Sequence, residues 1–300
     1  MTAVAVTPRS FRATPGPHLD LLRESGLDVR FPELQRPLDE DEMVGLVEGC
    51  AGLVVGVDPV TRRVLEAGPL RVVVKFGTGT DNIDLAAAGE LAVKVSSTPT
   101  ANALSVAELT IALLLALARN IALHDRLARA RSWERRPGIE LAGKRLGIVG
   151  YGAVGREVAR IAGSLGMDVV AHDPFLQEAD VELVDLATLL GSADAISLHV
   201  PLSESTRDLI DAEALEQIRP GALLVNTARG GIVDEQALAE ALRSGRLAGA
   251  AVDVFAEEPP WGSPLVGLDN VVLSPHAGAA TAEAARRAGL QAVEQLLRDL

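Results

Sequence analysis

The segment "RLGIVGYGAVGREVARIAGSLGMDVVAHD", residues 145–173, determines the predicted fold. It opens with an apolar run typical of a buried strand. Gly150, Gly152 and Gly155 follow with G-x-G-x-x-G spacing, where a helical pattern begins. The first glycine permits a tight turn, the second lets backbone approach a pyrophosphate, and the third lets the helix pack on the strand. The segment therefore predicts a strand–helix–strand unit with a phosphate-binding turn.

An acidic residue at the end of the second strand extends this prediction to a dinucleotide. Asp173 lies eighteen residues after Gly155, where a carboxylate can accept a hydrogen bond from the ribose 2′-hydroxyl of NAD. The same charge would repel the 2′-phosphate of NADP, and no lysine or arginine follows in "DPFLQE" to neutralise it. We therefore predict NAD as the cofactor. A purely structural glycine turn is the alternative, and the complete strand, helix and acid context disfavours it.

Strand and helix patterns alternate along the whole chain, which predicts an α/β protein. Strands that are apolar on both faces and separated by helices are typical of a parallel sheet covered on two sides. Segment 102–119 is apolar almost all round and predicts a long buried helix. Strands are expected at residues 3–6, 52–57, 71–76 and 91–95 in the first third, and from "KRLGIVG" onward also at 168–173, 195–200, 222–226, 249–255 and 270–275.

Composition excludes several classes of protein. The formal net charge of −13 argues against a nucleic-acid partner, which would need a concentrated basic face. Cys50 is the only cysteine, so no intrachain disulfide or multi-cysteine metal site can form, and we expect no metal and a reducing, cytoplasmic location. The first residues lack the apolar core of a secretory signal, and "TIALLLALA" is shorter than the ~20 residues of a membrane span. We therefore expect no membrane partner.

Ionisable residues follow three strands of the second series and are candidates for catalysis. Arg229 follows "LLVN", Glu257 and Glu258 follow "AAVDVFA", and His276 follows "NVVLSP". The carboxyl ends of successive parallel strands face one crevice, so these residues can converge near the nicotinamide. Arginine offers a fixed fork of donors for a carboxylate and a keto oxygen, and histidine is the usual proton donor near neutral pH. This set favours hydride transfer to a 2-keto acid.

Each of these residues also has a simpler structural interpretation. A single arginine is more often a surface ion-pair partner, a histidine after Ser-Pro a turn residue, and glutamates before prolines solvated loop charges. The residues by themselves leave open which glutamate pairs with His276. We interpret Gly230 and Gly231 as leaving room for a substrate beside Arg229. His199 is placed near the crevice without an identified partner.

At these residues the chain resembles the D-isomer-specific 2-hydroxyacid dehydrogenase family. Within that family it is most similar to the 3-phosphoglycerate dehydrogenase-type branch. The resemblance implies an NAD-dependent oxidoreductase that interconverts a D-2-hydroxy acid and its 2-keto acid, with 3-phosphoglycerate as one candidate. The similar segments cover nearly the whole chain and are, in order, "FGTGTDNIDL", "TPTANALSVAELT", "GKRLGIVGYGAVGREVA", "NTARGGIVDEQAL", "GAAVDVFAEEPP" and "LSPHAG".

The resemblance also implies roles for individual residues. Arg229 is implied to bind and polarise the substrate, His276 to act as acid–base, and Glu258, directly before Pro259, to be the partner of the histidine. The remaining assignments are Thr78, Gly79 and Asn102, with Arg229 and His276, for the substrate, and Gly150, Gly152, Ala153, Val154, Gly155, Asp173, His199, Val200, Pro201, Thr206, Thr227 and Asp253 for the cofactor.

The fold implied by the resemblance is two Rossmann-like, doubly wound parallel-sheet domains with an interdomain cleft. Residues 1–98 and 281–300 would form the substrate-binding domain and residues 99–280 the NAD-binding domain. Family members suggest a homodimer through the NAD domain, using the long helix and the arm that bears Trp133.

The chain departs from the phosphoglycerate-specific pattern at one place. Those members carry an arginine just after the strand that corresponds to "GLVV", where this chain has Gly56 and Val57. Arg62 and Arg63 come later, at a helix start, and Arg9 is a candidate replacement. Recognition of a substrate phosphate is therefore left open.

Two other functions are compatible with the sequence. One is a non-catalytic NAD-binding assembly protein, like the corepressors related to this family, which retain the same arginine, glutamate and histidine. The other is a dehydrogenase of formate or phosphite. The acidic balance of the chain weighs against an assembly protein.

Overall fold

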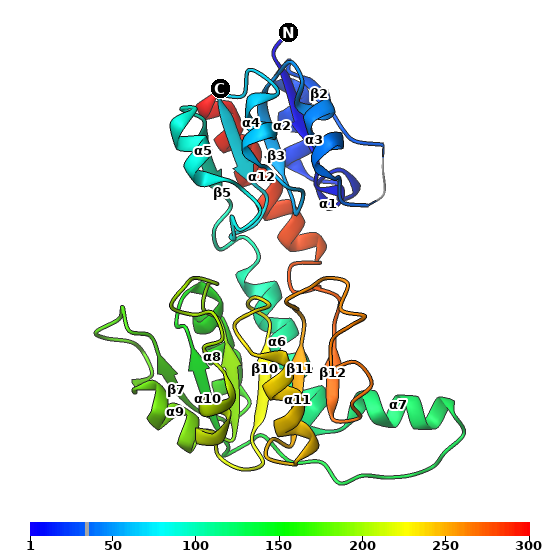
Figure 1. Cartoon of the computed structure of the whole chain (residues 1–300), viewed down its shortest axis with the longest axis vertical. Coiled ribbons are helices and arrows are strands. Elements are labelled where there is room, and N and C mark those ends of the chain that lie inside the picture. The colour runs from blue at the N-terminus through cyan, green and yellow to red at the C-terminus, as the bar shows by residue number, and fades with distance from the viewer. Residues whose placement is uncertain (34–35) are drawn as a thin grey trace. The chain divides into compact units, whose positions relative to one another are not determined.

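Two parallel sheets, each with an apolar core on both of its faces, make up the protein (Figure 1). The computed structural model describes residues 1–33 and 36–300. These divide into two compact units: unit 1 comprises Met1–Ser105 and Ala279–Leu300, and unit 2 comprises Val106–Gly278. The predicted fold class, two α/β units built on parallel sheets, is confirmed.

The two units divide close to the predicted boundaries. The chain passes from unit 1 to unit 2 after Ser105 and returns after Gly278, beside the predicted divisions at residues 98 and 280. Assignment of substrate binding to unit 1 stays a prediction.

Unit 1 contains five parallel strands in the order β2-β1-β3-β4-β5. One face of the sheet packs on Met43 and Val64, and the other on Phe11 and on Leu296 of the C-terminal helix. The strands are β1 (Ala3–Val6), β2 (Asp28–Arg30), β3 (Cys50–Val55), β4 (Val72–Lys75) and β5 (Lys94–Ser97). The helices are α1 (Arg9–Ala13), α2 (Pro17–Glu24), α3 (Glu40–Val47), α4 (Arg62–Glu66), α5 (Leu85–Glu90) and α12 (Ala282–Asp299).

Strand β5 begins later than predicted. The apolar pattern placed a strand at residues 91–95, whereas the structure has it at Lys94–Ser97. Ala92 has a φ of 55°, which is left-handed backbone that a strand cannot contain. The first half of the predicted strand is therefore the turn that follows α5.

Unit 2 contains seven parallel strands in the order β12-β11-β10-β9-β6-β7-β8. The strands are β6 (Arg145–Val149), β7 (Asp168–His172), β8 (Glu182–Leu183), β9 (Ala195–Leu198), β10 (Leu223–Asn226), β11 (Gly249–Val252) and β12 (Val271–Leu273). The helices are α6 (Ala103–Ala118), α7 (Ile121–Arg129), α8 (Ala153–Ser164), α9 (Leu186–Ser192), α10 (Ala212–Gln217) and α11 (Glu235–Arg243).

The strand order of unit 2 identifies the end of the sheet where a ligand is expected. From β6 the chain first builds outward through β7 and β8, and then returns to the other side of β6 with β9. In open parallel sheets, ligands bind beyond the carboxyl ends of the strands where the order reverses in this way. The glycine turn follows β6 at this reversal point.

Helix α6 corresponds to the long buried helix predicted from the apolar segment. Ala107 and Leu114 on this helix are buried in the core of unit 2. Within residues 1–33 and 36–300, no single helix is long and apolar enough to cross a membrane. Helices α6 and α7, bent by 63° at their junction, satisfy the length and composition criteria only as a pair.

Candidate active site

The glycine turn between β6 and α8 has the geometry expected of a phosphate-binding turn. Gly150 has a φ of 93°, and a Cβ there would lie 2.7 Å from the backbone of His199. A Cβ on Gly155 would lie 2.3 Å from the carbonyl oxygen of Gly150, so strand and helix pack closely. A Cβ on Gly152, the N-cap of α8, would meet no described atom within 4 Å. The turn thus leaves open backbone at a helix N-terminus, which fits a dinucleotide pyrophosphate.

Asp173 follows β7 and is fixed beside this turn. Its Oδ2 accepts the N–H of Tyr151 at 3.0 Å, and its Oδ1 accepts the N–H of Phe175 at 3.0 Å. Each carboxylate oxygen has a further lone pair that can accept a hydrogen bond. The geometry therefore fits the predicted contact with a ribose hydroxyl.

Tyr151, which lies between Gly150 and Gly152 in the turn, is a residue that sequence analysis missed. Its ring is buried, and its hydroxyl donates to Asp180 at 2.7 Å. Burial of the ring, together with this hydrogen bond, raises the pKa of Tyr151 to about 12. The Arg156 guanidinium lies 4.7 Å from the centre of the ring and 3.3 Å from Asp180. The cation nearest in sequence to the turn is thus engaged by an acid.

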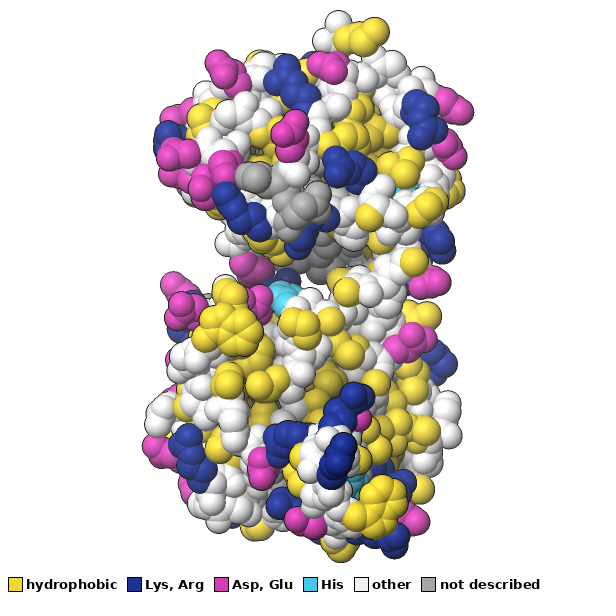
Figure 2. Space-filling model, turned by 90° about the vertical axis from the view of Figure 1, so that its right-hand side faces the viewer, with side chains coloured by type: hydrophobic (Ala, Val, Ile, Leu, Met, Phe, Trp, Pro, Cys, Tyr) yellow, Lys and Arg dark blue, Asp and Glu magenta, His cyan; other side chains and the backbone are white. Residues whose placement is uncertain are grey.

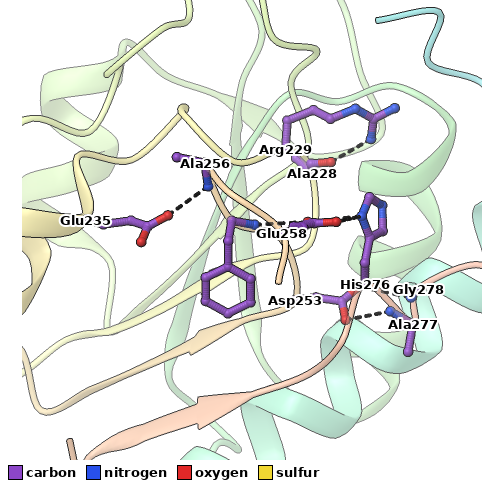
Figure 3. Close-up of polar contacts among 10 residues, drawn as sticks. Ala228, Arg229, Glu235, Asp253, Ala256, Glu258, His276, Ala277 and Gly278 are labelled. Atoms are coloured by element: carbon purple, nitrogen blue, oxygen red, sulfur yellow. Dashed lines mark hydrogen bonds and ion pairs between the residues drawn. The ribbon is translucent and has the colours of Figure 1, made fainter. Parts of the chain in front are cut away.

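Glu258 and His276 form a direct pair. Nδ1 of His276 lies 2.9 Å from one carboxylate oxygen of Glu258 and 3.1 Å from the other (Figure 3). Oε1 of Glu258 also accepts the N–H of Phe255 at 3.1 Å. The side chains of His276 and Glu258 are 44% and 39% exposed, so a small molecule can reach the ring. Among the described residues, neither a hydrogen bond nor an ion pair of Glu257 is found. Glu258, and not Glu257, is therefore the partner of His276.

This pairing determines which atom of the ring is available. When Nδ1–H of His276 donates to the carboxylate, Nε2 is left to face outward. The carboxylate also restrains the rotation of the ring, because both of its oxygens lie within hydrogen-bonding distance of Nδ1. The pair therefore has the arrangement of an oriented acid–base catalyst.

The backbone at His276 is held in an unusual conformation by a buried acid. His276 has a φ of 53°, which costs a non-glycine residue about 1 kcal/mol. Its N–H donates to the carbonyl oxygen of Asp253 at 2.8 Å. The Asp253 side chain, 1% exposed, accepts the N–H groups of Ala277 and Gly278 at 2.8 and 2.9 Å (Figure 3). Asp253 thus holds the turn that presents the histidine, and its contact with a cofactor stays a prediction.

Arg229 lies in a loop that is packed on the loop of Glu258. Its guanidinium donates to the carbonyl oxygen of Ala228 at 2.6 Å, and Asn226 donates to the carbonyl oxygen of Arg229 at 2.9 Å. A Cβ on Gly230 would lie 1.9 Å from the carbonyl oxygen of Phe255. The interpretation of Gly230 as room for a substrate is therefore wrong, because its bare backbone accommodates the neighbouring loop instead.

The three ionisable residues follow three adjacent strands. Arg229 follows β10, Glu258 follows β11 and His276 follows β12, and these strands are neighbours in the sheet. Because the strands are parallel, all three residues lie beyond the same edge of the sheet. Figure 3 shows them in one close-up, with the pair Glu258–His276 at its centre.

His199 differs from His276 in its surroundings. Its Nε2 lies 2.7 Å from Oγ of Ser197, and its N–H donates to the carbonyl oxygen of Val149 at 2.7 Å. The residue as a whole is partly buried, and desolvation of the ring lowers the pKa of His199 to about 3. A histidine that stays neutral near pH 7 is a poor proton donor, so His276 is the better candidate.

This neutral histidine predicts a pH dependence of stability. The unfolded chain binds a proton at His199 below about pH 6.5, which the folded chain does not bind until about pH 3. The free energy of unfolding should therefore fall across this window, by on the order of 2 kcal/mol between pH 7 and pH 4.5. Urea denaturation at both pH values measures this loss. The free energy of unfolding of His199→Gln should fall less than that of the wild type. The control His124→Gln should lose as much as the wild type. Equal losses in wild type and His199→Gln would contradict a neutral buried ring.

Several other predicted cofactor residues make contacts within unit 2. The hydroxyl of Thr227 lies 2.8 Å from that of Thr110 on α6, and both residues are buried. Thr206 closes a turn by donating to the carbonyl oxygen of Pro201 at 2.6 Å. Val200 lies against the glycine turn, because a Cβ on Gly150 would approach its side chain to 2.9 Å. Their contacts with a cofactor stay predictions.

The predicted substrate residues of unit 1 follow β4. Thr78 and Gly79 come directly after Gly77, whose N–H donates to the buried hydroxyl of Thr98 at 2.8 Å. Sequence analysis missed Lys75, which is buried and donates to Asn82 at 2.6 Å. A lysine inside the apolar run "RVVVKF" was the available signal for it.

The arginines near the departure from the phosphoglycerate pattern are already paired. Arg62 lies 2.5 Å from Glu90, and Arg63 forms ion pairs with Glu40 and Asp41. Val57, one of the two residues found where phosphoglycerate-specific members carry an arginine, is 65% exposed.

Comparison with known proteins gives consistent matches. Residues 111–278 match the model of the D-isomer specific 2-hydroxyacid dehydrogenase NAD-binding domain. The hydroxypyruvate reductase of Thermotoga maritima is 46% identical over 272 residues, which are 88% of this chain and 89% of that protein. The D-3-phosphoglycerate dehydrogenase of Methanocaldococcus jannaschii is 42% identical over 283 residues, 91% of this chain. This chain spans only 54% of that dehydrogenase. The TT0316 protein of Thermus thermophilus has a TM-score of 0.90 at 40% identity, covering 99% of this chain and 96% of its own.

Proposed function

Because the chain belongs to the D-isomer-specific 2-hydroxyacid dehydrogenase family, whose members are NAD-dependent oxidoreductases, we propose that it interconverts a short D-2-hydroxy acid and its 2-keto acid. The observation that carries the proposal is the contact between Glu258 and Nδ1 of His276, beyond the same sheet edge as Arg229. It supplies an oriented proton donor beside a cation that can bind a carboxylate or carbonyl oxygen.

In this proposal each residue has a defined task during reduction. When bound at the glycine turn, NADH would supply the hydride for the carbonyl carbon of the keto acid. Arg229 binds the acid and draws electron density toward the carbonyl oxygen, and Nε2 of His276 gives that oxygen its proton. Glu258 keeps the ring oriented through its contact with Nδ1. The backbone N–H groups of Thr78 and Gly79, with Asn102, are proposed to hold the substrate carboxylate.

We propose hydroxypyruvate, an unphosphorylated keto acid, as the preferred substrate. The matched hydroxypyruvate reductase is 46% identical to this chain, and the matched phosphoglycerate dehydrogenase is 42% identical. The arginine expected of phosphate-binding members is replaced by Gly56 and Val57, and Arg62 and Arg63 are engaged by acids. Without the arginine of the phosphoglycerate-specific pattern, a substrate phosphate would form fewer charge-assisted hydrogen bonds at this position.

A substrate panel tests this proposal. NADH oxidation is measured with hydroxypyruvate, glyoxylate, pyruvate and 3-phosphohydroxypyruvate, and NAD reduction with formate and phosphite. We expect the highest kcat/KM for hydroxypyruvate. A higher value for 3-phosphohydroxypyruvate would contradict the substrate, and turnover of only formate or phosphite would contradict the reaction. Tight NADH binding without turnover of any compound would support an assembly protein instead.

Cofactor choice is predicted to depend on Asp173. Asp173→Ala should lower the ratio of kcat/KM with NADH to that with NADPH by about 10-fold, because a charge-assisted hydrogen bond to the ribose is lost and repulsion of the 2′-phosphate is relieved. Asp168→Ala is the control, since Asp168 lies at the opposite end of β7 in an ion pair with Arg145. An unchanged ratio in Asp173→Ala would argue against the assigned contact.

We also propose that the protein forms a homodimer through unit 2. The segment that follows α7 carries exposed Trp133 (83%) and Ile139, and Ile121 on α7 is exposed as well. No ion-pair partner of Arg135 or Arg136 is found among the described residues. Figure 2 faces the side on which α7 lies and shows hydrophobic and basic side chains together at the lower end of unit 2. The rest of the chain is acidic, so a second copy offers both apolar and opposite-charge contacts.

Disruption of this surface is predicted to favour the monomer. Trp133→Ser removes the largest exposed ring of the arm and should raise the dimer dissociation constant by at least about 10-fold, because aromatic anchors dominate such contacts. Sedimentation velocity across micromolar concentrations measures it, with Val57→Ser in unit 1 as the control. A dimer of unchanged stability would place the interface elsewhere.

A cytoplasmic location without a membrane or nucleic-acid partner also stays a proposal.

A further inference from the structure

The loop that carries Glu258 is tied at two points to a single carboxylate. Glu235, the first residue of α11, accepts the N–H of Ala256 at 2.8 Å through Oε1 (Figure 3). Its Oε2 accepts a short hydrogen bond from the hydroxyl of Ser263. Ala256 and Ser263 lie on either side of Glu258 in the chain, so one side chain closes the loop that presents the partner of His276.

We propose that Glu235 is a positioning residue for the acid–base pair: by holding both ends of the 256–263 loop, it keeps the Glu258 carboxylate against His276. The inference rests on the proposed function, because it assigns Glu235 a task in the same proton transfer. Glu235 touches neither the histidine ring nor, in this proposal, the substrate or cofactor.

The bonds inside the loop are few, which makes an external tie important. Glu258 accepts the N–H of Phe255, Ser263 donates its N–H to the carbonyl oxygen of Pro260 at 3.0 Å, and Leu265 is fully buried beyond the loop. Hydrogen bonds to an ionised carboxylate are stronger than neutral ones, so Glu235 adds two strong restraints from outside this segment. A shift of about 1 Å in a catalytic group can cost on the order of 100-fold in rate.

Helix capping does not account for these contacts. Asp234 is the N-cap of α11, and its carboxylate accepts the N–H groups of Gln236 and Ala237 at 2.9 and 3.1 Å. The helix start is therefore satisfied by the preceding residue. Both described hydrogen bonds of the Glu235 carboxylate lead to the loop.

Kinetics of three variants test the role of Glu235. Glu235→Ala should lower kcat for the keto acid by about 10- to 100-fold with little change in KM or in the Kd of NADH, because only the proton donor is displaced. Ser263→Ala removes one of the two ties and should give a smaller loss in the same parameter. Glu235→Gln keeps an acceptor of the same length and should recover part of the lost kcat. Glu240→Ala, on the exposed face of the same helix, is the matched control and should match the wild type.

A double-mutant cycle separates positioning from general stability. If Glu235 acts through Glu258, then adding Glu235→Ala to Glu258→Gln should cost little further kcat, since the group being positioned is already gone. Additive losses would overturn the proposal. So would an unchanged kcat in Glu235→Ala.

Fluorescence of Trp261 reports the loop independently of activity. Trp261 lies between Ala256 and Ser263, is 81% exposed, and becomes the only tryptophan in a Trp133→Phe background. Time-resolved anisotropy should gain a fast component in Glu235→Ala and, to a lesser degree, in Ser263→Ala. An unchanged decay in both would overturn the proposal. Should Glu235→Ala not fold, Ser263→Ala and Glu235→Gln carry the same test.

The two readouts also separate this inference from the proposed function. A looser loop in Glu235→Ala, combined with a Glu258→Gln variant of wild-type activity, would keep the tie and refute the acid–base role. A Glu258→Gln variant of low activity, combined with fully active Glu235→Ala, would refute only the positioning role.

Discussion

Arg229→Lys is expected to lower kcat/KM for the keto acid by about 100- to 1,000-fold while the Kd of NADH changes less than about twofold. The guanidinium is a planar fork that donates to the carbonyl oxygen of Ala228. Asn226 donates to the backbone carbonyl oxygen of Arg229 and so holds the main chain at this residue. The guanidinium can donate to a carboxylate oxygen and a carbonyl oxygen at once. An ammonium keeps the charge but loses the fork, so ground-state binding would survive better than stabilisation of the developing oxyanion.

Steady-state kinetics with hydroxypyruvate and fluorescence titration with NADH measure the two parts of this prediction. Arg219→Lys is the control, because Arg219 forms an ion pair with Asp194 before β10. Turnover equal to the wild type in Arg229→Lys would remove Arg229 from the reaction. A parallel loss of NADH affinity would instead indicate damage to the nucleotide site.

Glu258→Gln is expected to lower the rate of keto-acid reduction by about 100-fold, with little change in the Kd of NADH. The Glu258 carboxylate accepts a hydrogen bond from Nδ1 of His276 and so fixes the tautomer and the orientation of the ring. An amide cannot replace both carboxylate oxygens as acceptors, so Nε2 would no longer be presented to the substrate in a fixed position. Steady-state kinetics with hydroxypyruvate measure the loss.

Glu257→Gln is the matched control for this experiment. It makes the same chemical change one residue earlier, on a side chain for which the described part of the structure has no hydrogen bond to His276. The rate of Glu257→Gln should be that of the wild type. A loss of rate in Glu257→Gln and none in Glu258→Gln would reverse the assignment of the pair.

The nucleotide end of the fold could be predicted from sequence because its determinants are local. Gly150, Gly152 and Gly155 lie within six residues and act through their own backbone, and Asp173 follows at the end of the very next strand. Parallel strand order then places the ends of β10, β11 and β12 together without any knowledge of side chains.

Contacts between distant segments could not be predicted in the same way. The choice between Glu257 and Glu258 depends on how the loop turns before Pro259, and spacing alone left it open. The contact of Asp253 with a cofactor stays a prediction, and the sequence does not show that its carboxylate also binds backbone more than twenty residues later in the chain. Glu235 is the first residue of α11, and its contact with the loop after β11 is visible only in the structure.

One contact was within reach of sequence reasoning and was missed. His199 was left without a partner, although Ser197 lies two residues earlier on the same strand pattern. Side chains at positions i and i+2 of a strand point to the same face. The alternation itself therefore indicated the serine.

The close approach of Gly230 to the Phe255 carbonyl bears on attempts to redesign the enzyme for bulkier acids. No side chain fits between these two segments, so an insertion or a larger residue near Arg229 would push on the stretch leading to Glu258. Under the proposed function, a change on this side would therefore disturb protonation by His276 as well as substrate binding by Arg229. Substitutions intended to change the substrate are better attempted at positions away from the contact between Gly230 and Phe255.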